Sequence, residues 1–276
     1  MKSQSLGGLD YDFLRYIGVE PETQKRIQGF YLPFFQGCKS VVDLGCGQGD
    51  FLDLLEEMGI EATGVDRDEK CCAVARERGL NVVCQDVFDY LRGLDEESVG
   101  GIFSAHLVEH LPYERVIELF RLSHRALVKG GKIVLSTPNV RALSSHLDMF
   151  YLHFGHVTFY HPRLLGFFLE YAGYSDVQMG ENPETAFPLW GHLMSEPSQE
   201  LGSLIPSIRY DPLLPLPSNP LRKVIWRGKM FLVRLIVQPY LDRIVGEMNA
   251  RLERLSRTLE DLDRPFECYA RASKPG

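Results

Sequence analysis

The chain has 276 residues, 45% of them hydrophobic, which is enough to bury one large core with or without a sizeable insertion. A formal net charge of −7 argues against a nucleic-acid-binding protein, since such a protein normally presents a basic face. The sequence shows no signal peptide and no stretch apolar enough to cross a bilayer. The adjacent Cys71 and Cys72, with no CxxC pair, favour a reducing compartment, so we expect a cytoplasmic protein.

Short apolar segments alternate with amphipathic ones through the first half of the chain. After a short helix over residues 22–36, the predicted strands are 40–44, 61–66, 81–86, 100–106 and 132–138. The predicted helices between them are 49–59, 68–79, a short one that ends at Leu91, and 113–131, which two glycines stop. This alternation indicates βαβ units and, with right-handed crossovers, a doubly wound α/β fold with a parallel sheet.

The pattern changes after Pro138. A helix over 161–174 and a strand over 175–180 are followed by a proline-rich stretch, a basic and apolar helix over 221–237, and heptad-like leucine spacing from Leu241 to Leu262. Residues 266–275 alternate like a strand, and we expect them to be the last strand of the same sheet. The interpretation is a single domain over 1–276 with a loop and helical insertion over 181–264.

Two parts of this insertion leave their roles open. The helix over 221–237 has the composition of a segment that contacts an anionic membrane surface or an acidic glycan, but a lid or a dimer contact with snorkelling basic ends is favoured. The heptad run is short, so intramolecular packing and homodimer pairing are equally open.

Three glycines, Gly45, Gly47 and Gly49, directly follow the first predicted strand. Their spacing does not fit the dinucleotide fingerprint G-x-G-x-x-G, and no G-K-[ST] follows, which disfavours a nicotinamide oxidoreductase or a nucleotide phosphate site. Asp43 and Asp50 flank the loop and would repel a phosphate. A cationic ligand with an amino-acid end suits this place better.

At these residues the sequence resembles the class I S-adenosylmethionine-dependent methyltransferases. The stretch VVDLGCGQGDFLDLL is similar to the first motif of that family, and GVDRD, CQDVFDY and LVKGGKIVLSTPN follow in the family's order over residues 40–139. The resemblance implies S-adenosyl-L-methionine as cofactor and a mostly parallel, seven-stranded Rossmann-like sheet with a helical insertion before the last strand.

The resemblance also implies cofactor-binding positions. Asp66 is at the position where an acidic residue of the family accepts both ribose hydroxyls. Asp86 is at the position where an acidic residue of the family meets the adenine amino group. Arg26 and Tyr31 are candidates for the carboxylate and methionine end, unless they only cover the sheet edge. The full expected set is Arg26, Tyr31, Asp43, Gly45, Cys46, Gly47, Asp66, Arg67, Asp86, Val87 and His106.

A narrower likeness concerns methyltransferases of bacterial surface-polysaccharide (O-antigen) biosynthesis. It rests on RIQGFYLPFF, HLVEHLP, STPN and FYLHFGHVTFYHPRLLGFFLEYAGY, over residues 22–180. It implies O-methylation of a saccharide hydroxyl or a terminal group of a glycan. The alternatives are methylation of a small phenolic or quinone-type metabolite and, in another class, a cofactor-binding but inactive scaffold in a biosynthetic complex.

A hydroxyl acceptor needs a group that takes its proton. The segments AHLVEHLP and YLHFGHVTFYHP offer histidines, and the related enzymes share the Glu-His pair and the later histidine. The resemblance therefore implies catalytic roles for Glu109, His110 and His156. The alternative is that these residues are structural. The pattern His-x-x-Glu-His, at residues 106–110, could bind a divalent metal ion. Some methyltransferases have Glu-x-x-Glu-His in this place, but here His106 replaces the first glutamate, which disfavours magnesium. No metal site is assigned.

Overall fold

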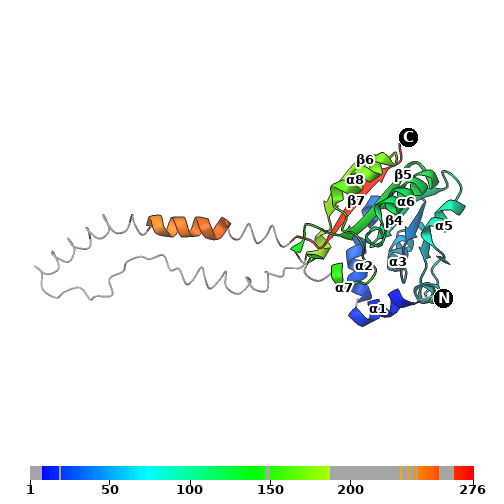
Figure 1. Cartoon of the computed structure of the whole chain (residues 1–276), viewed down its shortest axis with the longest axis horizontal. Helices are drawn as coiled ribbons and strands as arrows, with labels where there is room; N and C mark the ends of the chain where they lie inside the picture. The colour runs from blue at the N-terminus through cyan, green and yellow to red at the C-terminus, as the bar shows by residue number, and fades with distance from the viewer. Residues whose placement is uncertain are drawn as a thin grey trace, which may run out of the picture. The chain divides into compact units, whose positions relative to one another are not determined.

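The computed structural model describes residues 8–18, 20–143, 145–146, 150–186, 231, 235, 239, 242–254 and 264–276. The chain divides into two compact units, Met1–Phe187 with Arg264–Gly276, and Pro188–Asp263 (Figure 1). In the second unit residues 242–254 are helical, within the predicted heptad run. Apart from isolated positions, the predicted basic helix over 221–237 lies outside the described residues.

The first unit is built on one seven-stranded sheet. Its strands are β1 (Ser40–Leu44), β2 (Glu61–Asp66), β3 (Val82–Cys84), β4 (Val99–Ala105), β5 (Leu127–Pro138), β6 (Ser175–Glu181) and β7 (Glu267–Ser273). Their order is β3-β2-β1-β4-β5-β7-β6, and β7 alone runs antiparallel, between β5 and β6. This confirms the predicted doubly wound, mostly parallel fold, with the last predicted strand in the same sheet.

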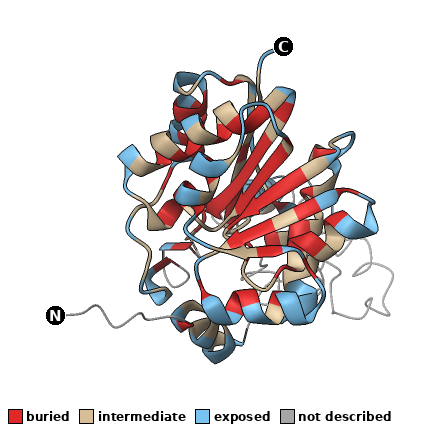
Figure 2. Ribbon diagram, turned by 90° about the vertical axis from the view of Figure 1, so that its right-hand side faces the viewer, coloured by how far each residue is buried: buried red, intermediate tan, exposed pale blue. Residues whose placement is uncertain are grey.

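Helices cover both faces of the sheet, so the central strands β1 and β4 are buried on both sides (Figure 2). On one face Val41, Phe103 and Val134 pack against η1 (Leu32–Phe35), α3 (Asp50–Glu57) and α4 (Glu69–Glu77). On the other, the neighbouring Val42, Ile102 and Ile133 pack against α5 (Val87–Gly93), α6 (Tyr113–Ala126) and α8 (Pro162–Tyr171). The period of two in strand side chains therefore builds two cores.

Shorter elements gather where the parallel strands end. They are α1 (Leu9–Ile17), α2 (Pro21–Gly29), η2 (Val108–His110), α7 (Phe150–Leu152) and η4 (Pro183–Thr185). The predicted helix over 22–36 is thus two pieces, α2 and η1. Helix α1 was not predicted.

Two predicted boundaries are wrong for identifiable reasons. The helix predicted over 113–131 ends at Ala126, because Leu127 pairs with Val99 and starts β5; the two glycines lie inside that strand, with Gly130 at φ 74°. The insertion predicted from residue 181 begins at Pro188, because residues 182–186 bond back to β7, with Asn182 N–H donating to the Glu267 carbonyl at 3.0 Å. That the two units act as one domain remains a prediction.

All six cysteines are free thiols, as their spacing indicated. None of the helices in the described part of the chain combines the length and apolarity needed to cross a membrane.

Candidate active site

The glycine loop lies between β1 and α3, at the carboxyl edge of the sheet. Gly45, Gly47 and Gly49 have φ values of 80°, 54° and 86°, a left-handed region that favours glycine. The amides of Gly45 and Cys46 donate to the Val65 carbonyl at 2.8 and 3.2 Å, which ties the loop to β2. A Cβ at Gly47 would meet nothing within 4 Å, so one side of the loop is open to a ligand.

Asp66, the last residue of β2, bridges the loop and the start of α4. Its Oδ2 accepts the Gly47 amide and its Oδ1 the Asp68 amide, both at 2.8 Å. Burial raises the pKa of Asp66, and the two backbone hydrogen bonds oppose that shift. Each carboxylate oxygen keeps a further lone pair, so the group can still accept two hydroxyls.

Asp43 lies buried behind the loop. Its exposed fraction is 2%, and burial, together with the charges of Asp66 and Asp50, raises its pKa well above the usual range. A cationic ligand beside Asp43 would favour the ionised form of this carboxyl. The open glycine loop, the Asp66 carboxylate and this buried acid fit the amino-acid and ribose parts of S-adenosylmethionine.

The other expected cofactor residues are arranged along the same edge. Asp86 caps α5 by accepting the Phe88 amide at 2.9 Å, with its side chain exposed, and Val87 and Cys46 are buried. The thiol pKa of Cys46 is raised by burial. Arg67 is exposed and forms a 3.6 Å ion pair with Asp10 of α1.

Arg26 and Tyr31 have partners of their own. The Arg26 guanidinium donates to the Glu184 carboxylate and to its carbonyl at 3.1 Å. Tyr31 is fully buried, and its hydroxyl donates to Glu267. Their binding of the cofactor remains a prediction.

A buried ionic network stands where β4 ends. His106 lies between two carboxylates, with Nδ1 at 3.0 Å from Glu109 Oε1 and Nε2 at 2.9 Å from Glu267 Oε2. Glu109 also accepts the Thr137 hydroxyl at 3.0 Å, and Asn182 Nδ2 donates to Glu267 at 3.3 Å. The network joins β4, β5, β7 and the segment after β6.

The network holds His106 as an imidazolium ion. Burial opposes the charge, but hydrogen bonds to Glu109 and Glu267 raise the pKa of His106 to about 10. Burial also opposes ionisation of Glu109, but His106 lowers the pKa of that carboxyl. Because both nitrogens of His106 are engaged, this residue cannot act as a general base; its φ of 52° is a strained value for a histidine.

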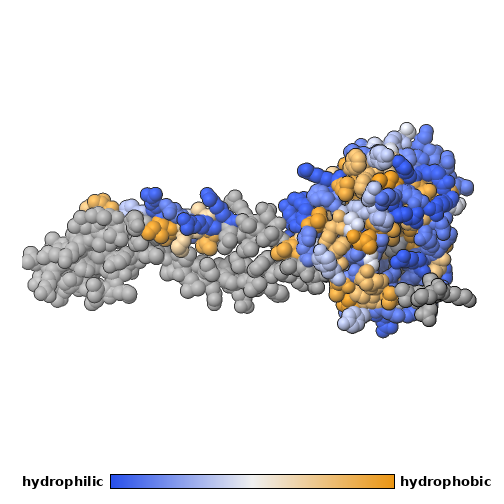
Figure 3. Space-filling model, in the orientation of Figure 1, coloured by the Kyte–Doolittle hydropathy of each residue, from blue (hydrophilic) through white to orange (hydrophobic). Residues whose placement is uncertain are grey.

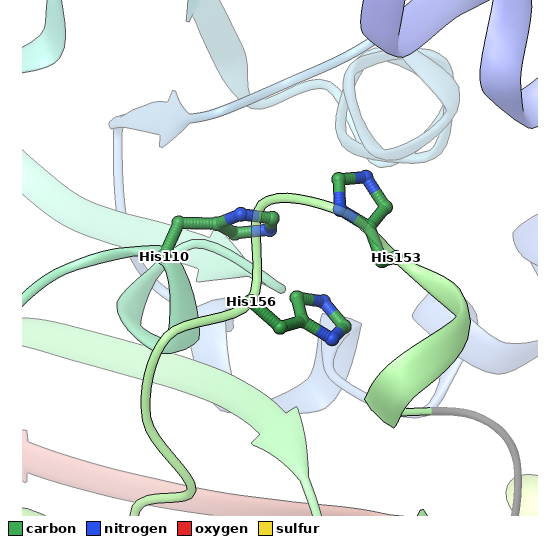
Figure 4. Close-up of side chains that lie close together, drawn as sticks. All are labelled: His110, His153 and His156. Carbon is green, nitrogen blue, oxygen red and sulfur yellow. The ribbon is translucent and has the colours of Figure 1, made fainter.

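Three other histidines face one another beside this network: His110 from η2, and His153 and His156 from the loop after α7 (Figure 4). Each pair of ring centroids is 4.8 Å apart. His156 Nδ1 lies 2.7 Å from the Phe150 carbonyl, and its Nε2 lies 3.9 Å from Glu109 Oε1. The structure thus brings together the three predicted catalytic residues, Glu109, His110 and His156.

Burial shapes the protonation of this histidine cluster (His110, His153 and His156). Burial, with the nearby charges of His110 and His156, lowers the pKa of His153 to about 4. Burial also lowers the pKa of His156, against the Phe150 hydrogen bond and the Glu109 charge. At neutral pH both rings are uncharged.

Aromatic and apolar side chains surround the cluster. Phe13 of α1 packs edge-on against His153 and Phe154, with centroid distances of 4.7 and 5.6 Å. The exposed apolar side chains of α7 and the loop that follows it are Tyr151, Leu152, Phe154 and Val157. Apolar patches lie among hydrophilic side chains on the visible face of the first unit (Figure 3).

The sequence interpretation missed Glu267, Thr137, Asn182 and the part played by His153. Glu267 is 161 positions from His106, and a single acid at the start of a strand carries no signal of its own. His153 had a signal, since it is one of three closely spaced histidines with His156 and His161, but its spacing alone did not distinguish it from an ordinary loop residue.

Comparison with known proteins agrees with this geometry. A family model described as a methyltransferase domain matches residues 19–179. The ubiquinone biosynthesis O-methyltransferase of Idiomarina loihiensis is 33% identical over 106 residues, which is 37% of this chain and 43% of that protein. The chain therefore matches less than half the length of such curated relatives.

Solved structures extend the likeness over most of the chain. A SAM-dependent methyltransferase from Archaeoglobus fulgidus has a TM-score of 0.67 and 29% identity, with 96% of this chain and 99% of that one covered. The phosphoethanolamine N-methyltransferase 2 of Haemonchus contortus, solved with S-adenosyl-L-methionine, has a TM-score of 0.52 and 17% identity over 96% of this chain and 60% of its own, and it shares the fold. The chain belongs to the methyltransferase domain family, as an S-adenosylmethionine-dependent methyltransferase.

Proposed function

We propose that this chain transfers the methyl group of S-adenosylmethionine to an oxygen of a small phenolic or quinone-type acceptor. The hydrogen bonding of His156 carries the proposal. Its Nδ1 faces a carbonyl at 2.7 Å and must donate a proton to it, so Nε2 is the unprotonated nitrogen. A neutral imidazole with a free lone pair is a general base for an acceptor hydroxyl.

Glu109 is the positioning residue in this scheme. Its Oε1 lies 3.9 Å from His156 Nε2 and would stabilise the imidazolium that forms when the proton is taken. Because His106 and Thr137 hold both carboxylate oxygens, Glu109 keeps a fixed orientation. His110, whose ring adjoins that of His156, is the second candidate for the base.

The strength of this base favours a phenol over a sugar. A phenolic hydroxyl titrates near pH 10, whereas an alkyl hydroxyl is far less acidic, so an imidazole is better matched to the phenol. The buried Phe150 stacks on Phe159 with centroids 3.6 Å apart and lies 4.9 Å from His156, and the half-buried Phe159 keeps part of its ring for an aromatic acceptor to pack against.

The relatives support the same choice. The curated proteins that match act in ubiquinone biosynthesis by their names, and they support the small-metabolite alternative better than the expected polysaccharide acceptor. Asp66, Asp86 and the glycine loop are proposed to hold the cofactor, with the methyl group directed toward the carboxyl end of β4. Methyl transfer then needs alignment of the acceptor oxygen, which the enzyme supplies by orientation.

The test is methyl transfer from radiolabelled S-adenosylmethionine to catechol, a methoxybenzoquinol and methyl glucoside. We expect methylated phenol or quinol and no methylated sugar, and we expect His156→Ala to lower kcat/KM by about 10²–10⁴-fold. His161→Asn is the matched control, because His161 is exposed and caps α8 through Nδ1, a role that asparagine keeps.

Transfer to the glucoside alone would overturn the choice of acceptor. Full activity of His156→Ala and His110→Ala would overturn the assignment of the base. Cofactor binding without transfer to any acceptor would favour the inactive scaffold.

A further inference from the structure

We propose that His110, His153 and His156 bind a divalent transition-metal ion, with Zn²⁺ the preferred ion, and that its binding inhibits methyl transfer. The inhibitory half rests on the proposed function, whereas the binding half rests on the cluster alone. One ligand atom from each residue lies within 4.8 Å of the others. No other group of three or more such side chains within metal-binding reach occurs in the described part of the chain.

Each ring of the cluster has one nitrogen that can bind such an ion. His156 offers Nε2, because its Nδ1 donates to Phe150. His153 offers Nδ1, which accepts the Gly155 amide at 3.0 Å, so an ion bound there replaces one hydrogen bond. The His110 ring makes no hydrogen bond to any described residue, and it is free to turn either nitrogen toward an ion.

The three ligand nitrogens must move closer together to bind the ion. Ligand nitrogens of a tetrahedral zinc ion, at about 2.0–2.1 Å from the metal, are about 3.4 Å from one another. The three nitrogens must therefore close from separations of up to 4.8 Å, by rotation of the histidine side chains. Three imidazoles with an open fourth position suit Zn²⁺, Co²⁺ or Ni²⁺ and are poor ligands for magnesium.

The ionic network around His106 limits which neighbouring side chains can act as metal ligands. His106 and Glu109, which the sequence pattern His-x-x-Glu-His put forward as ligands, already bind each other, Glu267 and Thr137. His106 therefore has no free ring nitrogen for an ion, and each carboxylate oxygen of Glu109 already accepts one hydrogen bond. The Glu109 carboxylate still lies 3.9 Å from His156 Nε2 and adds negative charge beside the site.

A bound ion would inhibit methyl transfer because it would occupy the unprotonated nitrogen of His156. The ring has one unprotonated nitrogen, and an ion that occupies it leaves no lone pair to accept the proton of the acceptor hydroxyl. Metal binding and base catalysis by His156 therefore exclude each other.

The binding half is tested with CoCl₂ and ZnCl₂ on the full chain, after treatment with a chelator. One Co²⁺ per chain should give visible ligand-field absorption without a thiolate charge-transfer band, which separates the histidine cluster from the six cysteines. ZnCl₂ should displace the Co²⁺. His110→Ala and His156→Ala should each weaken Co²⁺ binding by about tenfold or more, whereas His161→Asn should bind as the wild type does.

A fourth variant keeps all three histidines. A Cβ at Gly155 would lie 2.7 Å from His110 Nδ1, so Gly155→Ala should displace that ring and weaken Co²⁺ binding. Gly93→Ala, where a Cβ meets nothing within 4 Å, is its control. Circular dichroism of each variant establishes that it is folded.

Absence of Co²⁺ absorption in the folded wild type, a thiolate band, or unchanged affinity in the histidine variants would overturn the metal site. Inhibition is measured with the phenolic acceptor, and we expect ZnCl₂ to reduce transfer at the concentration that displaces Co²⁺. Stimulation by ZnCl₂ would overturn the inhibitory role. If no acceptor is methylated, the proposed function fails while the Co²⁺ result still decides the site.

Discussion

Glu109 is the residue on which the polar part of the site converges. It bonds His106 and Thr137 through its side chain, and its backbone carbonyl accepts the amides of Val157 and Thr158 at 2.9 and 3.2 Å. One residue therefore fixes the strained His106 and the loop that carries His156. Because Glu109 is fully buried, its charge is tolerable only with these partners.

The protonated His106 makes stability depend on pH. The pKa of His106 is raised from 6.5 to about 10 on folding, so its stabilising contribution is full below pH 6.5 and is lost as pH rises through about 10. Between pH 7.5 and 8.5 the folded chain holds about one more proton than the unfolded chain. The free energy of unfolding should fall there by up to about 1.4 kcal/mol per pH unit.

Urea denaturation at several pH values between 6.5 and 8.5 measures this slope. His106→Asn is the variant to compare, because asparagine tolerates the positive φ of 52° and does not titrate. We expect the variant to be less stable and its stability to be nearly independent of pH in this window. Equal slopes for wild type and variant would show that His106 is not held as an imidazolium ion.

At the scale of elements, α1 links the two halves of the site. Its Asp10 and Asp12 pair with Arg67 and Lys70 beside Asp66, and Phe13 packs against His153. No local pattern predicts this role, because α1 is nine residues long and its partners are far along the chain. Contacts between distant segments are what a single sequence shows least.

Loss of the Phe13 ring should loosen the histidine loop. Each aromatic contact contributes about 0.5–1.5 kcal/mol, so Phe13→Ala should speed hydrogen exchange of the His156 and Val157 amides by about tenfold. Tyr16→Ala, on the same helix and 86% exposed, should leave these amides unchanged. Similar exchange in both variants would contradict the packing described for α1.

The elements that could be predicted are those with local patterns. Strands β1 and β2 match their predicted bounds because the apolar runs there end at a glycine or an acid. The spacing of Gly45, Gly47 and Gly49 predicted the glycine loop. The end of α6 was misplaced because a glycine pair stops a helix and bends a strand equally well. Glu267 reaches the site only through the antiparallel register of β7, which no local pattern encodes.

At the scale of the whole molecule, the first unit closes on itself where the second begins. The Phe266 amide donates to the Thr185 carbonyl at 3.3 Å, and Arg264 pairs with Glu181 at 3.0 Å. The chain thus leaves and re-enters the first unit at neighbouring points. The seven strands, and the described residues of both cores, all belong to the first unit.

Replacement of residues 188–263 by a short glycine-serine linker should therefore leave the first unit folded. We expect its affinity for S-adenosylhomocysteine to stay within about threefold of that of the full chain, because long insertions in surface loops alter stability little. Loss of cooperative unfolding in this variant would show that the second unit is needed for the fold.

The cofactor site is tested most directly by a calorimetric titration of the full chain with S-adenosylhomocysteine, repeated with Asp66→Asn. Both oxygens of Asp66 already accept backbone amides, so an asparagine must turn its NH₂ toward one of them, and the charge is lost. Affinity should fall by at least about tenfold. Asp176→Asn, in β6 at the far edge of the sheet, should bind as the wild type does. Equal affinity of wild type and Asp66→Asn, or no binding by folded wild type, would contradict the assignment of the glycine loop and Asp66 as the cofactor site.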